Sequence, residues 1–209
     1  MIEPNQIVLY PIFSKVIYVT KTAVDINKLL KAADKEKYHI AGDKNRYSNY
    51  SYSSINKEIL NKKSFSFIKK EMINCVNKYS SEVMRYKNKM TMTRSWFTKA
   101  EPTQSAESHR HNNSFLSAVL YLKTDPDCGG LGFVDYSPKT IAPVIEEENR
   151  WNCSEYIFQP EDNLLIIFHS DMYHKILPNK SDKLRYSLAM NFMPEGEWGD
   201  PKTDGYCKI

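Results

Sequence analysis

The chain has 209 residues, of which 41% are hydrophobic and 26% charged, a composition typical of a globular protein with a substantial core. No segment approaches the ~20 consecutive apolar residues of a membrane-spanning helix, so no membrane partner is expected. The net charge of +4 is dispersed and forms no dense basic stripe interleaved with aromatic residues, which disfavours a nucleic-acid-binding protein.

The first residues and the cysteines bear on the cellular compartment. The opening MIEPNQIVLYPIF lacks the basic region and apolar stretch of a secretory signal. The four cysteines lack CxxC spacing, which is typical of free thiols rather than a disulfide framework; they are Cys75, Cys128, Cys153 and Cys207. We therefore expect a cytoplasmic protein, with residues 1–209 forming a single domain.

Two amphipathic helices are predicted in the first ninety residues. Residues 23–34 carry apolar side chains at helical spacing behind Asp25, a possible N-cap. From Leu60 to Tyr86 apolar side chains recur every three or four residues, which predicts a longer helix. The polar and aromatic segment between them, 43–56, is interpreted as a loop or an irregular strand.

After Met90 the pattern changes to short β-prone runs separated by turn residues, which favours a sandwich or barrel. The runs are TMTRSWFT, FLSAVLYL, LGFVDY, LLIIF and LRYSLAMNF. Helices followed by strands predict an α+β domain in which the helices cover one sheet. We divide it into a helical N-terminal support (1–90), a β core (91–194) and a C-terminal tail (195–209). The segments 40–55 and 137–155 are expected to select the substrate.

A pair of histidines precedes one of these predicted strands. In an extended chain His109 and His111 project from the same face, so two imidazoles can meet one metal ion. His174 follows the buried run LLIIF. Ligands so far apart in sequence are typical of a catalytic metal site rather than a local zinc clip.

The last β-prone run carries a cationic slot. Alternation places Arg185, Ser187, Ala189 and Asn191 on one face and larger apolar residues on the core face. The guanidinium and the hydroxyl can bind a carboxylate. Asn191 is either a cofactor contact or an internally satisfied amide.

Four motifs in order resemble those of the Fe(II)- and 2-oxoglutarate-dependent oxygenases of the prolyl-hydroxylase-like branch. They are His109-Arg110-His111, Ser117-Ala118-Val119-Leu120-Tyr121-Leu122, Gly130-Leu131-Gly132-Phe133-Val134-Asp135, and His174-Lys175-Ile176-Leu177-Pro178 followed by Arg185-Tyr186-Ser187. The resemblance spans residues 90–194. It implies a double-stranded β-helix (jelly-roll or cupin-like) core with flanking N-terminal helices.

The resemblance also implies roles for individual residues. His109 and His174 would bind Fe(II), while Arg185 and Ser187, with Tyr121, would hold the distal carboxylate of 2-oxoglutarate. The partners would be 2-oxoglutarate, dioxygen and a small-molecule or protein substrate. The expected reaction is hydroxylation of an unactivated carbon of an amino-acid, peptidyl or small-metabolite substrate, with conversion of 2-oxoglutarate to succinate.

The sequence departs from the superfamily's usual pattern at His111, which replaces an acidic ligand. Three histidines would leave the site more positive, and they also suit zinc with a bound water. The third ligand is therefore His111, which we favour, or Asp135, or a group from outside the protein. Two alternatives remain at this point: a zinc or other divalent-metal enzyme on the same barrel, or a non-catalytic binding module.

Some further residues have weaker interpretations. Cys128-Gly129-Gly130 is predicted to be a hairpin turn, because paired glycines allow positive φ. Trp96, Tyr173 and Trp151 are either core residues or the frame of a substrate entrance.

Overall fold

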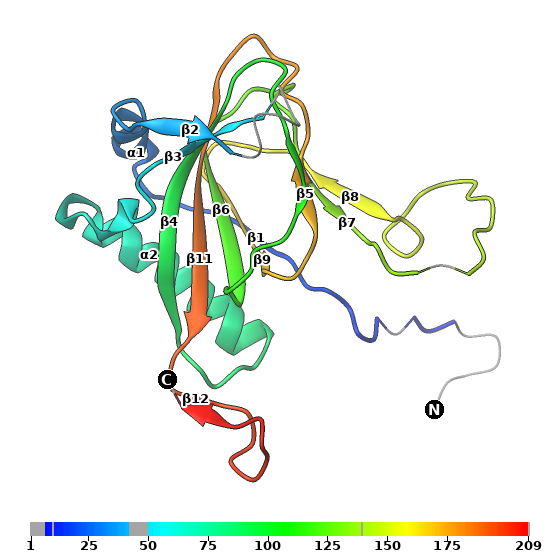
Figure 1. The fold of residues 1–209 in the computed structure, drawn as a ribbon. Coiled ribbons are helices and arrows are strands. Elements are labelled where there is room, and N and C mark those ends of the chain that lie inside the picture. Colours follow the sequence, from blue (N-terminus) through cyan, green and yellow to red (C-terminus); the bar gives the residue numbers. More distant parts are fainter. Residues whose placement is uncertain (1–6, 10, 42–49, 139, 209) are drawn as a thin grey trace.

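Two antiparallel sheets and two helices make up most of the computed structural model, which describes residues 7–9, 11–41, 50–138 and 140–208. In chain order the elements are β1 (Tyr18–Lys21), α1 (Ile26–Ala33), β2 (Tyr38–Ile40), β3 (Tyr52–Ser54), two 3₁₀ turns (Ile59–Asn61 and Lys63–Phe65), α2 (Ser66–Lys78), a π-helical turn (Tyr79–Val83), β4 (Met90–Ala100), β5 (Ala106–His109), β6 (Leu116–Lys123), β7 (Leu131–Val134), β8 (Glu155–Phe158), β9 (Leu164–His169), β10 (His174–Ile176), β11 (Arg185–Pro194), β12 (Glu197–Trp198) and β13 (Cys207–Lys208). Figure 1 shows their arrangement.

Apart from β12 and β13, which form a separate two-stranded sheet, the strands form a major and a minor sheet that face each other. The major sheet has the order β1-β9-β6-β11-β4-β3-β2, and the minor sheet has the order β5-β10-β7-β8. From β4 to β11 the chain passes repeatedly between the two sheets, and every pairing among these strands is antiparallel. This winding is a double-stranded β-helix, as the resemblance implied.

Strand alternation assigns the two faces of the major sheet to different surroundings. In β11, Tyr186, Leu188, Met190 and Phe192 belong to the larger apolar cluster, which also contains Leu29, Met72 and Val76 of the two helices. The opposite face of this strand looks toward the minor sheet. The predicted alternation of residues 184–192 is confirmed.

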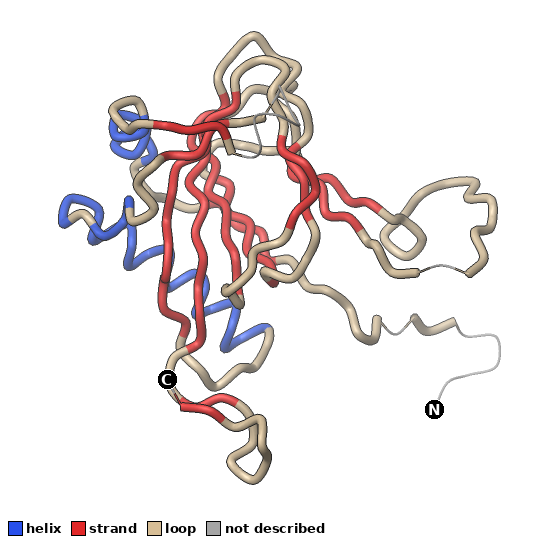
Figure 2. The backbone as a smooth tube through the Cα atoms, viewed as in Figure 1, coloured by secondary structure: helices blue, strands red, loops and turns tan. Residues whose placement is uncertain are grey.

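Both helices pack on the outer face of the major sheet (Figure 2). Helix α1 begins after Asp25, whose carboxylate accepts hydrogen bonds from the backbone N–H groups of Asn27 and Lys28, so the predicted cap is confirmed. The predicted helix 60–86 is instead divided into two 3₁₀ turns, α2 and a π-helical turn. The turns on both sides of α2 also bury apolar side chains, so the apolar periodicity of the sequence extends beyond the α-helix. No side-chain cap at Phe65 marks where α2 begins.

The N-terminal segment also contributes strands: β1 and β2 were not predicted, and β3 lies in the segment interpreted as a loop or an irregular strand. β1 pairs with β9, and β2 and β3 extend the sheet beyond β4. Of the segment 43–56, residues 43–49 lie outside the described part of the structure, and β3 lies in the remainder. Within the described residues, each helix is too short or too polar to cross a lipid bilayer.

Candidate metal centre

Three histidines meet at one end of the double-stranded β-helix. His109 ends β5 and His174 begins β10, where the two residues are direct partners across the minor sheet. His111 lies just beyond β5, and its backbone N–H donates to the carbonyl of Ser170 at 3.0 Å. One ligand atom from each imidazole lies within 4.8 Å of the other two. The ring centroids are 4.4 to 5.5 Å apart, so the three rings can share one ion.

Hydrogen bonds orient each imidazole for metal binding. The Nδ1 of His109 lies 2.7 Å from the carbonyl of Glu107, and that of His174 lies 3.0 Å from the carbonyl of Met172. A carbonyl can only accept, so each Nδ1 carries the proton. The lone pair on Nε2 is therefore available to a metal, and the acceptor on Nδ1 is the usual arrangement behind a metal-binding histidine.

His111 is oriented by side chains instead of a carbonyl. Its Nδ1 lies 2.8 Å from Asn191 Oδ1 and 2.8 Å from Ser117 Oγ. Ser117 in turn donates to the Asn191 oxygen at 3.1 Å and lies 2.8 Å from Ser170 Oγ. This network connects His111 to β6 and β11 of the major sheet, so the predicted inward direction of Asn191 is confirmed.

The cluster favours neutral imidazoles. Burial, with a smaller contribution from His109, lowers the pKa of His111 to about 4, although the hydrogen bond with Asn191 opposes this. Burial and the neighbouring His109 lower the pKa of His174 to about 3. Since metals bind the unprotonated ring, protons compete weakly with a metal here at neutral pH.

A buried cation lies beside the histidines. Arg185 is only 3% exposed, and its Nη1 donates to the carbonyls of Cys128 and Gly129 at 2.6 and 2.8 Å. Burial lowers the pKa of Arg185, yet guanidinium groups in proteins stay protonated. Within the described residues, Arg185 makes no ion pair with an acidic side chain.

Hydroxyl groups surround this arginine. Ser187 Oγ lies 2.5 Å from Thr98 Oγ1, and Tyr121 is Ser187's partner on β6. Burial raises the pKa of Tyr121 to about 12, with Arg185 opposing the shift, so the phenol keeps its proton at neutral pH and can donate a hydrogen bond. Arg185, Ser187, Thr98 and Tyr121 line a cavity of about 110 Å³ together with the three histidines.

The residues present fit a divalent metal and a small dicarboxylate. Three Nε2 lone pairs are held toward one point, and a buried charge without an acidic protein partner is costly unless an anion neutralises it. The charged side chain of Arg185 lines the same small cavity as the three histidines.

Asp135, the alternative third ligand, lies away from the histidine cluster. The carboxylate of Asp135 accepts hydrogen bonds from Ser137, and Asp135 is not a member of the histidine cluster. It lines a separate pocket, which Phe133 also lines. The geometry therefore favours His111 over Asp135 as the third ligand position.

Of the three aromatic residues proposed for an entrance, Trp96 lies at the site. Its ring is 5.7 Å from His111, and it lines the cavity. Tyr173 stacks with Tyr136 and the guanidinium of Arg110 instead. Trp151 is 58% exposed on the segment 137–155, which projects away from the sheets (Figure 1).

The prediction of a hairpin turn at Cys128-Gly129-Gly130 is wrong. Because β6 and β7 belong to different sheets, residues 124–130 connect the sheets rather than two paired strands. Gly129 has φ +79°, and a Cβ there would lie 2.2 Å from the carbonyl oxygen of Leu177. This turn presents the carbonyls of Cys128 and Gly129 to Arg185. Residue patterns did not reveal these two contacts, because backbone groups are common to every residue.

Comparisons with known proteins agree with this geometry. Residues 94–191 match the family model described as "Putative 2OG-Fe(II) oxygenase". No curated protein sequence matches the chain significantly. Similar solved structures include a 2OG-Fe(II) oxygenase family oxidoreductase from Burkholderia pseudomallei (TM-score 0.62, 11% identity, 84% of each chain covered). Others are a prolyl-4-hydroxylase from Pseudomonas putida (0.60, 16%, 88% of this chain and 95% of that chain) and HygX from Streptomyces hygroscopicus with nickel, 2-oxoglutarate and hygromycin B bound (0.58, 9%, 86% and 83%).

A double-stranded β-helix with three convergent imidazoles defines a jelly-roll fold with a candidate metal site. Residues 94–191 thus match the family model of the 2OG-Fe(II) oxygenases, and the similar solved structures share the fold of this chain. The resemblance seen in the sequence is confirmed.

Proposed function

We propose that this chain is a hydroxylase in which His109, His111 and His174 hold Fe(II) and Arg185 holds 2-oxoglutarate. The observation that carries the proposal is that three imidazoles line one small cavity with a buried guanidinium that pairs with no acidic side chain among the described residues. The substrate carbon would be an unactivated one of an amino acid, a peptide or a small metabolite.

The metal site would differ in charge from the usual site of two histidines and one carboxylate. Three neutral imidazoles add no negative charge to the divalent ion, and they leave coordination positions for other ligands. Two negative charges on 2-oxoglutarate would then be balanced by the ion and by Arg185. The protein contributes fixed donors, so its ligand atoms need little rearrangement when the metal binds.

Arg185 would position the distal carboxylate of 2-oxoglutarate. Its guanidinium offers further N–H donors beyond those used by Cys128 and Gly129, and hydrogen bonds to ionised groups are the strong ones. Ser187 and Tyr121 would add hydroxyl donors, and Thr98 holds the Ser187 hydroxyl in place.

When bound, iron and 2-oxoglutarate supply the activation of dioxygen and the oxidative decarboxylation to succinate. The chain's own part is to orient the substrate and keep water out. The wall of the cavity includes Val119, Leu131 and Ala189, which offer no hydrogen bond to water.

Anaerobic titration with Fe(II) and 2-oxoglutarate tests the proposal, using the weak visible metal-to-ligand absorption band as the readout. We expect the band in the wild type and at least an approximately 100-fold weaker 2-oxoglutarate affinity in Arg185→Ala, because losing one partner of a buried ion pair costs about 3 kcal/mol or more. Lys123→Ala, which removes an exposed charge at the end of β6, is the matched control.

Three results would overturn the proposal. The band could be absent from the wild type, or Arg185→Ala could bind 2-oxoglutarate as the wild type does. Stoichiometric zinc in the purified protein, with no turnover of 2-oxoglutarate after reconstitution with iron, would select the zinc-enzyme alternative.

We further propose that the chain acts as one domain in the cytoplasm. Hydrogen bonding of β1 to β9 and of β3 to β4, with β2 paired to β3, supports one folding unit. Free thiols at all four cysteines suit a reducing compartment. Fractionation of source cells, followed by detection of the protein, tests the location.

A further inference from the structure

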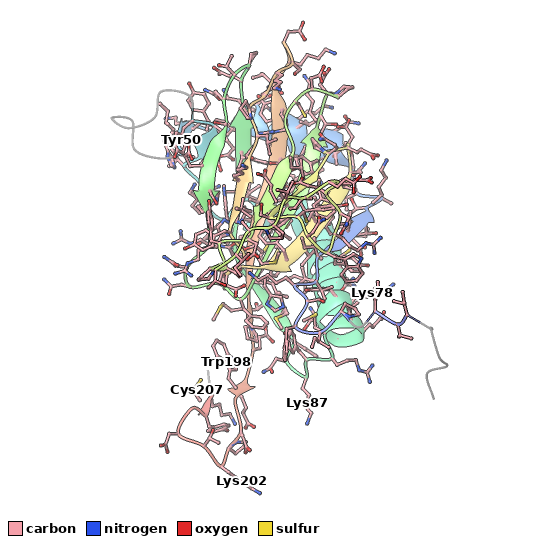
Figure 3. All side chains as sticks on the ribbon, turned by 90° about the vertical axis from the view of Figure 1, so that its right-hand side faces the viewer. Tyr50, Lys78, Lys87, Trp198, Lys202 and Cys207 are labelled. Atoms are coloured by element: carbon pink, nitrogen blue, oxygen red, sulfur yellow. The ribbon has the colours of Figure 1, made fainter. Side chains whose placement is uncertain are left out.

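A second, outer groove opens beside the histidine cavity and carries two cationic side chains. Its volume is about 600 Å³, and Lys57, Arg94, Trp96, His109 and Asn191 are among its lining residues. Trp96 and His109 also line the inner cavity, so the groove leads to the candidate metal centre. Figure 3 shows Tyr50, at the edge of this groove, far from the C-terminal hairpin that carries Trp198 and Cys207.

Lys57 is held in the groove by its surroundings. Its backbone carbonyl accepts from the N–H of Ser95 in β4 at 2.9 Å. Its ammonium donates to Ser53 Oγ at 2.5 Å and lies 5.8 Å from the centre of the Trp96 ring. The side chain is therefore anchored by neutral groups, and within the described residues no ion pair with an acidic side chain compensates its positive charge.

Arg94 adds a second positive charge close by. Burial lowers the pKa of Lys57, and the charge of Arg94 lowers it further, so the two cations interact. Among the described residues, the six ion pairs involve neither Lys57 nor Arg94. Glu107 is the acidic residue that lines the groove, and it forms no ion pair with either cation.

Two adjacent cations that repel each other are stabilised when an anion binds between them. We propose that the substrate carries a carboxylate or a phosphate that Lys57 and Arg94 bind in this groove, with the carbon to be hydroxylated directed toward the histidine cluster. The flat ring of Trp96 would pack against the part of the substrate between the two ends. This inference rests on the proposed function and narrows its substrate to an anionic class.

The anionic group can belong to a free small molecule or to an acidic side chain of a peptide. Both present the same chemistry to a lysine and an arginine. The groove is open on its outer side, so the test includes a probe of each kind.

The first experiment measures binding of inorganic pyrophosphate by tryptophan fluorescence. The protein is loaded with Ni(II) and 2-oxoglutarate, and Trp151→Phe and Trp198→Phe leave Trp96 as the reporter. We expect saturable binding and at least a tenfold loss of affinity in Lys57→Ala/Arg94→Ala. Lys123→Ala should bind as the parent does, and thermal unfolding verifies that each variant is folded.

The second experiment asks which molecules displace pyrophosphate. The probes are glycerol 3-phosphate against glycerol, and a short aspartate-rich peptide against its asparagine counterpart. Displacement by either charged probe and not by its neutral counterpart supports the proposal and identifies the source of the anion.

Three outcomes overturn the inference: no pyrophosphate binding, equal binding by the double variant, or an equal loss in Lys123→Ala. Failure of the proposed function would appear separately, as the absence of the metal-to-ligand band when the wild type is titrated with Fe(II) and 2-oxoglutarate.

Discussion

Asn191 and Ser117 orient the ring of His111, whereas backbone carbonyls orient the rings of the other two histidines. Carbonyls of Glu107 and Met172 accept from His109 and His174, while a side-chain amide accepts from His111. A side chain can be changed without moving the backbone, so this is the ligand whose orientation mutagenesis can alter selectively.

Asn191→Ala should weaken metal binding about 10- to 100-fold, the usual effect of removing the acceptor behind a metal-binding histidine. Calorimetric titration with Ni(II) measures the affinity. Asn191→Asp keeps an oxygen acceptor and should bind Ni(II) at least as tightly as the wild type. Unchanged affinity in a folded Asn191→Ala would show that Ser117 alone orients the ring.

The same histidines make the metal-free protein sensitive to acid. An unfolded histidine has a pKa of about 6.5, whereas the folded values are about 4 for His111 and about 3 for His174. At a pH between the unfolded and folded pKa values, the unfolded chain binds more protons than the folded chain. The contribution of the histidines is therefore complete above about pH 6.5 and is lost as the pH falls toward the folded pKa values.

Urea unfolding of metal-free protein should show this loss between pH 7 and pH 4.5, at about 1.4 kcal/mol for each unit of pKa difference that the pH range covers. His111→Gln removes one of the histidines whose pKa is lowered, so its free energy of unfolding should fall less over the same range. An identical pH dependence in both proteins would contradict the assigned shifts.

The chemistry-bearing side chains could be predicted from sequence, and their hydrogen-bond acceptors could not. His109, His111, His174 and Arg185 stand in recognisable motifs and do line one cavity. The carbonyls of Cys128, Gly129, Glu107 and Met172 belong to no residue type in particular, so only the folded backbone reveals them.

At the level of elements, length and β-propensity together decided which strands could be predicted, since the four-residue β7 was predicted from its run LGFVDY. β4, β6 and β11 have eight or more residues, enough for a period to be read. β1, β2 and β3 have three or four, which is too short for a distinctive alternation. Their pairing with the core strands supplies the stabilisation that their own sequence does not indicate.

The turn after β6 provides a prediction with an internal control. Gly129 and Gly196 both have positive φ, of 79° and 82°, but a Cβ at Gly129 meets two backbone carbonyls and a Cβ at Gly196 meets nothing within 4 Å. Gly196→Ala should cost about 1–2 kcal/mol from φ alone. Gly129→Ala should cost a further ~1–3 kcal/mol from overpacking.

Urea unfolding measures both free energies, and 2-oxoglutarate binding provides the functional readout. Gly129→Ala should also weaken 2-oxoglutarate binding, because the carbonyls of Cys128 and Gly129 would be displaced and would no longer accept hydrogen bonds from Arg185. Gly196→Ala should not. Equal costs in the two variants would mean that the chain near Leu177 yields readily.

On the scale of the whole molecule, the candidate metal centre joins the two sheets. His109 and His174 belong to β5 and β10 of the minor sheet, and His111 is tied through Asn191 and Ser117 to β11 and β6 of the major sheet. An ion bound by all three rings would therefore resist separation of the sheets, whichever face of the core opens first.

Metal binding should accordingly raise the global stability and not only order the site. A ligand at 100 times its dissociation constant stabilises the folded state by about 2.7 kcal/mol. For a chain of this size that corresponds to an increase of about 5 to 10 °C in the melting temperature. Scanning calorimetry with Ni(II), followed by excess chelator, should show the increase and its reversal. His174→Ala should abolish the increase, because the two remaining imidazoles, His109 at the end of β5 and His111 just beyond it, hold the ion weakly. An equal increase in that variant would place the stabilising ion elsewhere on the molecule.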